Sequence, residues 1–75
     1  MQGELMSKAA RKVLAEAVID GSIAEHMEEY NGLCFHCGAW TYGMCEPDAR
    51  NYKCDECGLY KVFGAEEAII RMEPI

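Results

Sequence analysis

The chain has 75 residues, of which 51% are hydrophobic, and a formal net charge of −6 at pH 7. A chain of this length forms one domain with a small core, and its hydrophobic content is too high for a disordered tail. The sequence has no apolar run long enough to cross a bilayer, and its first residues lack the basic-then-apolar order of a signal peptide. We therefore expect a single domain over residues 1–75 in the reducing cytoplasm, where cysteines bind metals more often than they form disulfides.

The N-terminal third is predicted to be helical over residues 4–30. From residue 4 to about residue 20, apolar side chains recur at three- and four-residue steps and form one stripe, made of Met6, Ala10, Val13, Leu14, Ala17 and Val18. Gly21 marks the end of this helix, because glycine suits a C-cap. We expect the stripe to cover the rest of the domain. The alternative is a helix presented to another protein or to a second copy of the chain. In the latter case the protein would be a homodimer rather than a monomer.

A second, shorter helix is predicted from residue 23 to about residue 30. Ser22 and Glu25 match a capping box, in which the two residues satisfy the first free amides of the helix. Asn31-Gly32 ends this helix. His26 lies on it, and we expect a surface or half-buried side chain there rather than a functional one.

Residues 33–63 are predicted to form a three-stranded ribbon. Aromatic and β-branched residues favour short strands, and the expected strands are residues 39–42, 51–53 and 59–63. The stretch between the first two is rich in turn-forming residues.

A short closing helix is predicted over residues 65–72. Glu66 and Glu67 stand at its start and Arg71 near its end, as the helix dipole favours, and Glu73-Pro74 stops it. The sequence therefore predicts a small α+β domain in which helices cover a ribbon.

Two cysteine pairs give the strongest chemical signal in the chain. The motifs are Cys34-x-x-Cys37-Gly38 and Cys54-x-x-Cys57-Gly58, with sixteen residues between Cys37 and Cys54. Two intervening residues allow both sulfurs of a pair to reach one ion, and the spacing matches a four-thiolate zinc site. Glycine after each second cysteine lets the backbone turn under the metal. We expect one structural Zn²⁺ per chain bound by Cys34, Cys37, Cys54 and Cys57, in a metal-stabilised zinc ribbon with two Cys-x-x-Cys-Gly knuckles.

Two further residues near the motifs have alternative readings. Cys45 can be a substitute ligand, a reactive thiol or the source of an intermolecular disulfide, but we expect a small apolar residue. His36 can replace Cys37 in a mixed site, although the glycine after Cys37 favours the cysteine, and we expect His36 to be exposed to solvent.

An aromatic group lies within the ribbon, consisting of Trp40, Tyr42, Tyr52 and Tyr60. We expect these rings to build the small core around the metal. The alternative is that they stack on the bases of a single strand, with phosphate contacts from Lys53, Lys61 and Arg50.

The sequence contains no pattern typical of an enzyme. A four-thiolate site leaves no open coordination position for a catalytic water. No nucleophile–base pair, phosphate-binding glycine loop or paired-carboxylate site is recognisable. We therefore expect a binding protein.

Two families resemble parts of this sequence. The stretch from Tyr52 to Gly58, followed by Val62-Phe63-Gly64-Ala65-Glu66-Glu67, resembles small zinc-ribbon proteins encoded by tailed bacteriophages. This resemblance covers residues 33–72 and implies binding to a host enzyme or defence complex in the host cytoplasm, or a role in phage transcription and DNA handling. The knuckles and the aromatic residues after the first one also resemble rubredoxins, which implies iron and electron transfer. The motifs here are closer together, and Asp55-Glu56 replaces the rubredoxin proline.

The charge of the chain bears on which partner to expect. Its seven Lys and Arg residues are spread out, which suits a phosphate backbone poorly. A protein partner is the first expectation, although solubility alone is another explanation of the acidic charge. The alternatives are a nucleic-acid-binding ribbon that uses the residues Trp40, Tyr42, Tyr52, Lys53 and Lys61, and an electron carrier.

Overall fold

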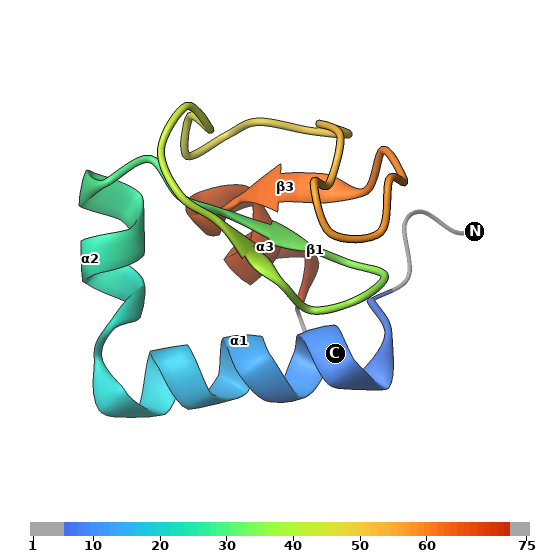
Figure 1. The fold of residues 1–75 in the computed structure, drawn as a ribbon. Helices are drawn as coiled ribbons and strands as arrows, with labels where there is room; N and C mark the ends of the chain where they lie inside the picture. The colour runs from blue at the N-terminus through green and yellow to red at the C-terminus, as the bar shows by residue number, and fades with distance from the viewer. Residues whose placement is uncertain (1–5, 73–75) are drawn as a thin grey trace.

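Three helices pack around a small antiparallel sheet in the computed structural model, which describes residues 6–72 (Figure 1). The elements in chain order are α1 (Lys8–Asp20), α2 (Ile23–Glu28), β1 (Gly32–Cys34), β2 (Trp40–Thr41), β3 (Val62–Gly64) and α3 (Ala65–Arg71). This order confirms the small α+β class, with an N-terminal helix, a three-stranded sheet and a short C-terminal helix. Among the described residues, no helix is long and apolar enough to span a membrane.

Helix α1 begins at Lys8, later than the predicted start. Ser7 is its N-cap, and the Ser7 hydroxyl accepts a hydrogen bond from the amide of Ala10 at 3.1 Å. At the other end, Gly21 takes a left-handed conformation with φ of 85°, which confirms the predicted C-cap. The first two residues of the predicted helix, 4 and 5, lie outside the described residues, as does the predicted stop at Glu73-Pro74.

The apolar stripe of α1 packs on the sheet of its own chain. The residues buried together there are Met6, Ala10, Leu14, Leu33, Phe35, Phe63 and Ala68. The stripe therefore covers the rest of the domain, as expected. Val18 was predicted to belong to it, but this side chain is exposed near the end of the helix, beside the more exposed Ile19.

The capping box predicted for the second helix is wrong. Ser22 has helical φ and ψ, whereas an N-cap side chain reaches the helix amides from an extended backbone, and Ser22 makes no such hydrogen bond. The Ser22 amide instead donates to Oδ1 of Asp20 at 2.8 Å. Helix α2 ends at Glu28, and Tyr30 turns the chain towards β1 with φ of 59°.

The sheet contains a central strand that the sequence pattern did not indicate. β1 lies between β2 and β3 and pairs antiparallel with both, so that Leu33 is opposite Trp40 on one side and Phe63 on the other. The predicted strand at residues 51–53 is reduced to one isolated bridge between Tyr52 and Val62. The predicted strand at residues 59–63 forms only from Val62 and extends through Gly64.

Glycines at the sheet let the loop after β2 pack directly on the strands. Gly32 and Gly64 are paired across β1 and β3. A Cβ atom at Gly64 would collide with the backbone oxygens of Glu46 and Pro47, and one at Gly32 would collide with Sγ of Cys45. Gly64 therefore belongs to the strand, one residue beyond the predicted end at residue 63.

The sheet therefore separates two small cores. Phe35 and Phe63 stack in the core on the helical side, with ring centroids 4.2 Å apart. The core on the loop side is smaller, and its buried members are Cys34, Cys45, Ala49, Cys54 and Val62. The expectation that the ribbon aromatics build the core is wrong for the tyrosines, because Tyr42 is 72% and Tyr60 65% exposed. Phenylalanines fill the core instead, since they leave no hydroxyl to satisfy.

Candidate metal centre

The two Cys-x-x-Cys-Gly motifs fold into matching turns. The Gly38 amide donates to the carbonyl of Cys34 at 2.9 Å, and the Gly58 amide donates to the carbonyl of Cys54 at 2.8 Å. Both glycines have φ of 81°, a conformation that other residues adopt at a cost. Each turn therefore depends on the glycine that follows its second cysteine.

Backbone amides in these turns point at the sulfur atoms. The amides of His36 and Cys37 lie 3.4 and 3.5 Å from Sγ of Cys34, and the Cys57 amide lies 3.5 Å from Sγ of Cys54. Such amides stabilise a thiolate over a thiol.

The four sulfur atoms form one compact cluster. Sγ of Cys34 lies 3.7 Å from Sγ of Cys57, and Sγ of Cys37 lies 3.6 Å from Sγ of Cys54. All four atoms are within 4.8 Å of one another. A disulfide would require a separation of about 2.0 Å, and a tetrahedral zinc–thiolate site has sulfur atoms about 3.8 Å apart, given Zn–S bonds of about 2.3 Å. The cluster can therefore hold one metal ion between thiolates from both turns.

The thiols of the cluster differ in acidity. Burial raises the pKa of Cys34, and it raises the pKa of Cys37 to about 12. Burial acts in the same direction on Cys54, but hydrogen bonds from the amides of Cys57 and Glu56 lower the pKa of Cys54 to about 7. Cys54 therefore loses its proton at a lower pH than Cys34 and Cys37 do.

The two neighbouring candidates lie outside the cluster. Cys45 is buried in the core on the loop side, where burial and the charge of Glu46 raise its pKa to about 11. This confirms the expectation of a small apolar residue. The side chain of His36 is exposed, and only its backbone amide points at the cluster, towards Sγ of Cys34. Among residues 6–72, the group that could hold a metal consists of the four cysteines alone.

One polar cluster was not anticipated from the sequence. The ring of His26 stacks on Trp40, with centroids 3.6 Å apart and planes at 7°. Oδ1 of the buried Asn31 accepts a hydrogen bond from the Gly43 amide at 2.9 Å, so Nδ2 of Asn31 donates to Nδ1 of His26 at 2.9 Å. Asn31 before Gly32 indicated only a turn, and no local pattern linked these residues to Trp40.

The residues of the alternative nucleic-acid site are not brought together as a set. Trp40 packs against the core on the helical side, whereas Tyr42, Tyr52 and Lys53 line one groove on the loop side. Arg50 pairs with the carboxylate of Glu67 at 3.4 Å.

Comparison with protein-family models, with curated proteins and with solved structures gives no match to this chain. What the fold and the site define is a small α+β domain with four cysteines clustered as a possible metal site.

Proposed function

We propose that this chain is a zinc ribbon in which Cys34, Cys37, Cys54 and Cys57 bind one Zn²⁺, and that it acts as a binding module without enzymatic activity. The observation that supports this most is the distance between sulfur atoms of the two turns, 3.6 and 3.7 Å. These values fit the edges of a zinc–thiolate tetrahedron.

The site would be structural. Four thiolates complete the coordination of zinc and leave no position for a water or a substrate. Zinc bound there would fasten the end of β1, at Cys34, to the second turn, at Cys57. A domain with two small cores depends on such a cross-link, because metal-binding free energy then adds to folding free energy.

The proposed partner is a protein. The formal charge of −6 and the dispersed cations support this choice over nucleic acid. We further propose that the chain works in a reducing cytoplasm, as a phage-type protein that modulates a host protein or complex would. The five free cysteines fit such a compartment.

Native mass spectrometry of the chain from zinc-supplemented cells, before and after a chelator, tests the metal. We expect one zinc per chain, removed by the chelator. A metal-free chain lighter by two hydrogens for each disulfide would contradict the proposal. A red protein with a reversible one-electron couple would instead favour iron, which tetrahedral thiolates also suit.

A pull-down from lysate with the zinc-loaded chain tests the partner. We expect one protein to be enriched, and we expect this enrichment to persist after nuclease treatment of the lysate. Nucleic-acid binding is the second candidate, because Tyr42, Tyr52 and Tyr60 are exposed and available for stacking. It predicts an affinity for single-stranded DNA or RNA that falls steeply with salt.

A further inference from the structure

The four clustered cysteines are not equally accessible to solvent. Cys57 is exposed, whereas Cys34 and Cys54 are buried and Cys37 is half-buried. Cys57 belongs to the outer part of the second turn, where residues 55–58 are all exposed. A small reagent dissolved in water therefore meets the sulfur of Cys57 before it reaches the other three.

The sulfur atoms also differ in how the backbone stabilises them. Sγ of Cys34 accepts hydrogen bonds from two amides of its own turn, and Sγ of Cys54 accepts one. Among the described residues, no amide makes such a hydrogen bond to Sγ of Cys57. Amide hydrogen bonds stabilise the charge of a thiolate and make it a weaker nucleophile. As a thiolate, Cys57 would thus be more reactive than Cys34 or Cys54.

A buried sulfur atom of the other turn lies next to this exposed one. Sγ of Cys34 is 3.7 Å from Sγ of Cys57, so the two atoms must approach by about 1.7 Å to form a disulfide bond of about 2.0 Å. Cys54, in the same turn as Cys57, has its sulfur 3.6 Å from that of Cys37. The exposed sulfur is therefore paired across the two turns.

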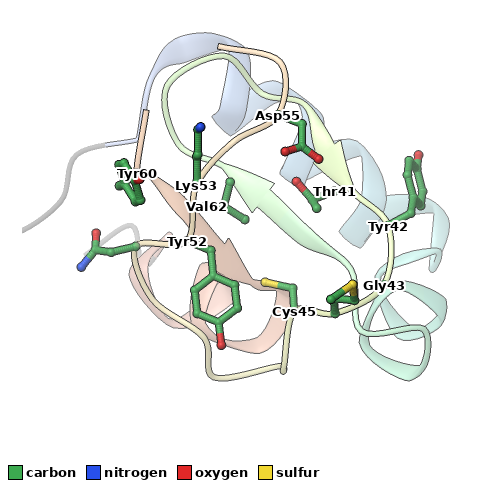
Figure 2. A pocket seen from close by; sticks show the side chains of 11 residues that line it. Thr41, Tyr42, Gly43, Cys45, Tyr52, Lys53, Asp55, Tyr60 and Val62 are labelled. Carbon is green, nitrogen blue, oxygen red and sulfur yellow. The ribbon is translucent and has the colours of Figure 1, made fainter. Parts of the chain in front are cut away.

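The second turn has room for this approach. A Cβ atom added at Gly58 would meet no atom within 4 Å, whereas one at Gly38 would lie 3.2 Å from the backbone of α1. Figure 2 shows Lys53 and Asp55, the residues on either side of Cys54, at the groove on the loop side of the sheet. The second turn can therefore move towards the first, and a bond between the turns leaves the backbone of each turn intact.

We infer that Cys57 is a modification site for peroxides, and that its oxidation forms a disulfide with Cys34 and releases the metal. This inference rests on the proposed function and deepens it by naming how the same site would be regulated. An exposed thiolate beside a second cysteine is the arrangement that peroxides oxidise reversibly. Disulfides formed in a reducing cytoplasm are usually of this transient, redox-sensing kind.

The reaction takes two steps, written here for hydrogen peroxide. The Cys57 thiolate attacks one oxygen, so that an S–O bond forms, the O–O bond breaks and hydroxide leaves. The Cys34 thiolate then attacks Sγ of Cys57, so that the S–S bond forms, the S–O bond breaks and a second hydroxide leaves. The two sulfurs lose two electrons in total, and these reduce the peroxide. Only Cys37 and Cys54 then remain as ligands, too few for a zinc site.

The disulfide would replace the cross-link that zinc makes. Cys34 is the last residue of β1, so a bond to Cys57 fastens the end of this strand to the second turn. The oxidised chain would exchange one cross-link for another. We therefore expect it to keep the helical circular dichroism that the reduced chain loses to a chelator.

Hydrogen peroxide added to the zinc-loaded full chain tests the pairing. A chromophoric chelator follows the release of zinc, and mass spectrometry maps the disulfides after alkylation of the remaining thiols. We expect the first disulfide to join Cys34 and Cys57, zinc to be released as it forms, and a thiol reductant to restore zinc binding. A first disulfide within one turn, or one that includes Cys45, would overturn the inference.

Two histidine substitutions separate the exposed thiolate from the site as a whole. Histidine also binds zinc, so Cys57→His and Cys37→His should each keep a site of three cysteines and one histidine. Cys57→His removes the attacking sulfur and should lose the release of zinc by peroxide. Cys37→His makes the same ligand change in the first turn and should keep this release, as should Cys45→Ala, whose buried sulfur is not one of the clustered atoms.

The results also distinguish the possible failures. Equal release of zinc from the two histidine variants would contradict the inference, and the disulfide map of the unsubstituted chain decides it if either variant fails to bind zinc. If the unsubstituted chain binds zinc and keeps it in peroxide, the inference is wrong and the proposed function stands. If that chain binds no zinc before oxidation, the proposed function fails and the inference fails with it.

Discussion

Asn31 and Glu67 are the buried polar side chains among the described residues, and each one joins separate segments of the chain. Asn31 connects His26 on α2 to the turn at Gly43. The carboxylate of Glu67 on α3 pairs with Arg50 of the loop before β3 at 3.4 Å, and with Arg71 of its own helix at 2.7 Å. A buried polar group that loses its partner costs about 1–3 kcal/mol, so each contact specifies one arrangement.

The stacked histidine should contribute to stability. We expect His26→Ala to lower the free energy of unfolding by about 1–2 kcal/mol, because Trp40 loses a ring contact and Asn31 loses an acceptor. His36→Ala is the control, since His36 is exposed, and it should change stability little. Denaturant titration followed by fluorescence of the single tryptophan measures both variants. Equal unfolding midpoints for the two variants would show that the stacking of His26 on Trp40 does not stabilise the fold.

Variants of the four clustered cysteines should lose metal, whereas a variant of Cys45 should keep it. Cys57→Ser leaves three thiolates, so we expect loss of stoichiometric zinc and of cooperative unfolding. Cys45→Ala should retain one zinc and lose only about 1–2 kcal/mol of stability, because it empties a small volume in the loop-side core while its sulfur is not one of the four clustered atoms. Zinc analysis of the purified variants is the measurement. The reverse pattern would mean that Cys45 is a ligand.

At the scale of elements, α1 packs closely against the first cysteine turn. A Cβ atom added at Gly38 would lie 3.2 Å from the backbone of Ala9. The equivalent Gly58 of the second turn has the same φ but open space beside it. The two turns are therefore alike in backbone and different in surroundings.

This difference gives a matched pair of substitutions. Gly58→Ala should cost about 1 kcal/mol for its left-handed conformation, and Gly38→Ala should cost at least about 1 kcal/mol more because α1 must shift. Thermal unfolding of the zinc-loaded variants measures both. If the two variants unfold at the same temperature, α1 does not pack on the turn in solution.

Elements with local signals were predictable, and those set by distant contacts were not. The periodicity of α1, its end at Gly21 and the grouping of the cysteines follow from neighbours in the sequence. β1 was missed because three residues show no usable alternation, and the strand exists through pairing with β2 and β3. The exposed tyrosines were misplaced for a similar reason: Phe35 and Phe63 fill the core, and only the fold brings them together.

At the scale of the whole molecule, zinc affinity should depend on pH. The raised pKa values of Cys34 and Cys37, the latter about 12, mean that both thiols hold their protons at neutral pH without metal. Metal binding must displace these protons, so affinity rises with pH and falls on acidification. Each proton that the metal must displace corresponds to about a tenfold loss of affinity per pH unit.

The dependence should become steeper below neutral pH. Cys54, with a pKa of about 7, takes up a further proton there, which it must also lose when its sulfur binds the metal. Competition with a chromophoric chelator over a pH series measures the slope, and helical circular dichroism should be lost along with the zinc. An affinity that is independent of pH would exclude thiolate ligation.

The position of β3 has a consequence for how the chain folds as it is made. Residues 62–71 supply Phe63 and Ala68 to the core that α1 needs, so α1 has no complete surface to pack on until these residues have been synthesised. All four clustered cysteines precede β3. During synthesis from the N-terminus, a metal can therefore join the two turns first, and the helices close over the sheet afterwards.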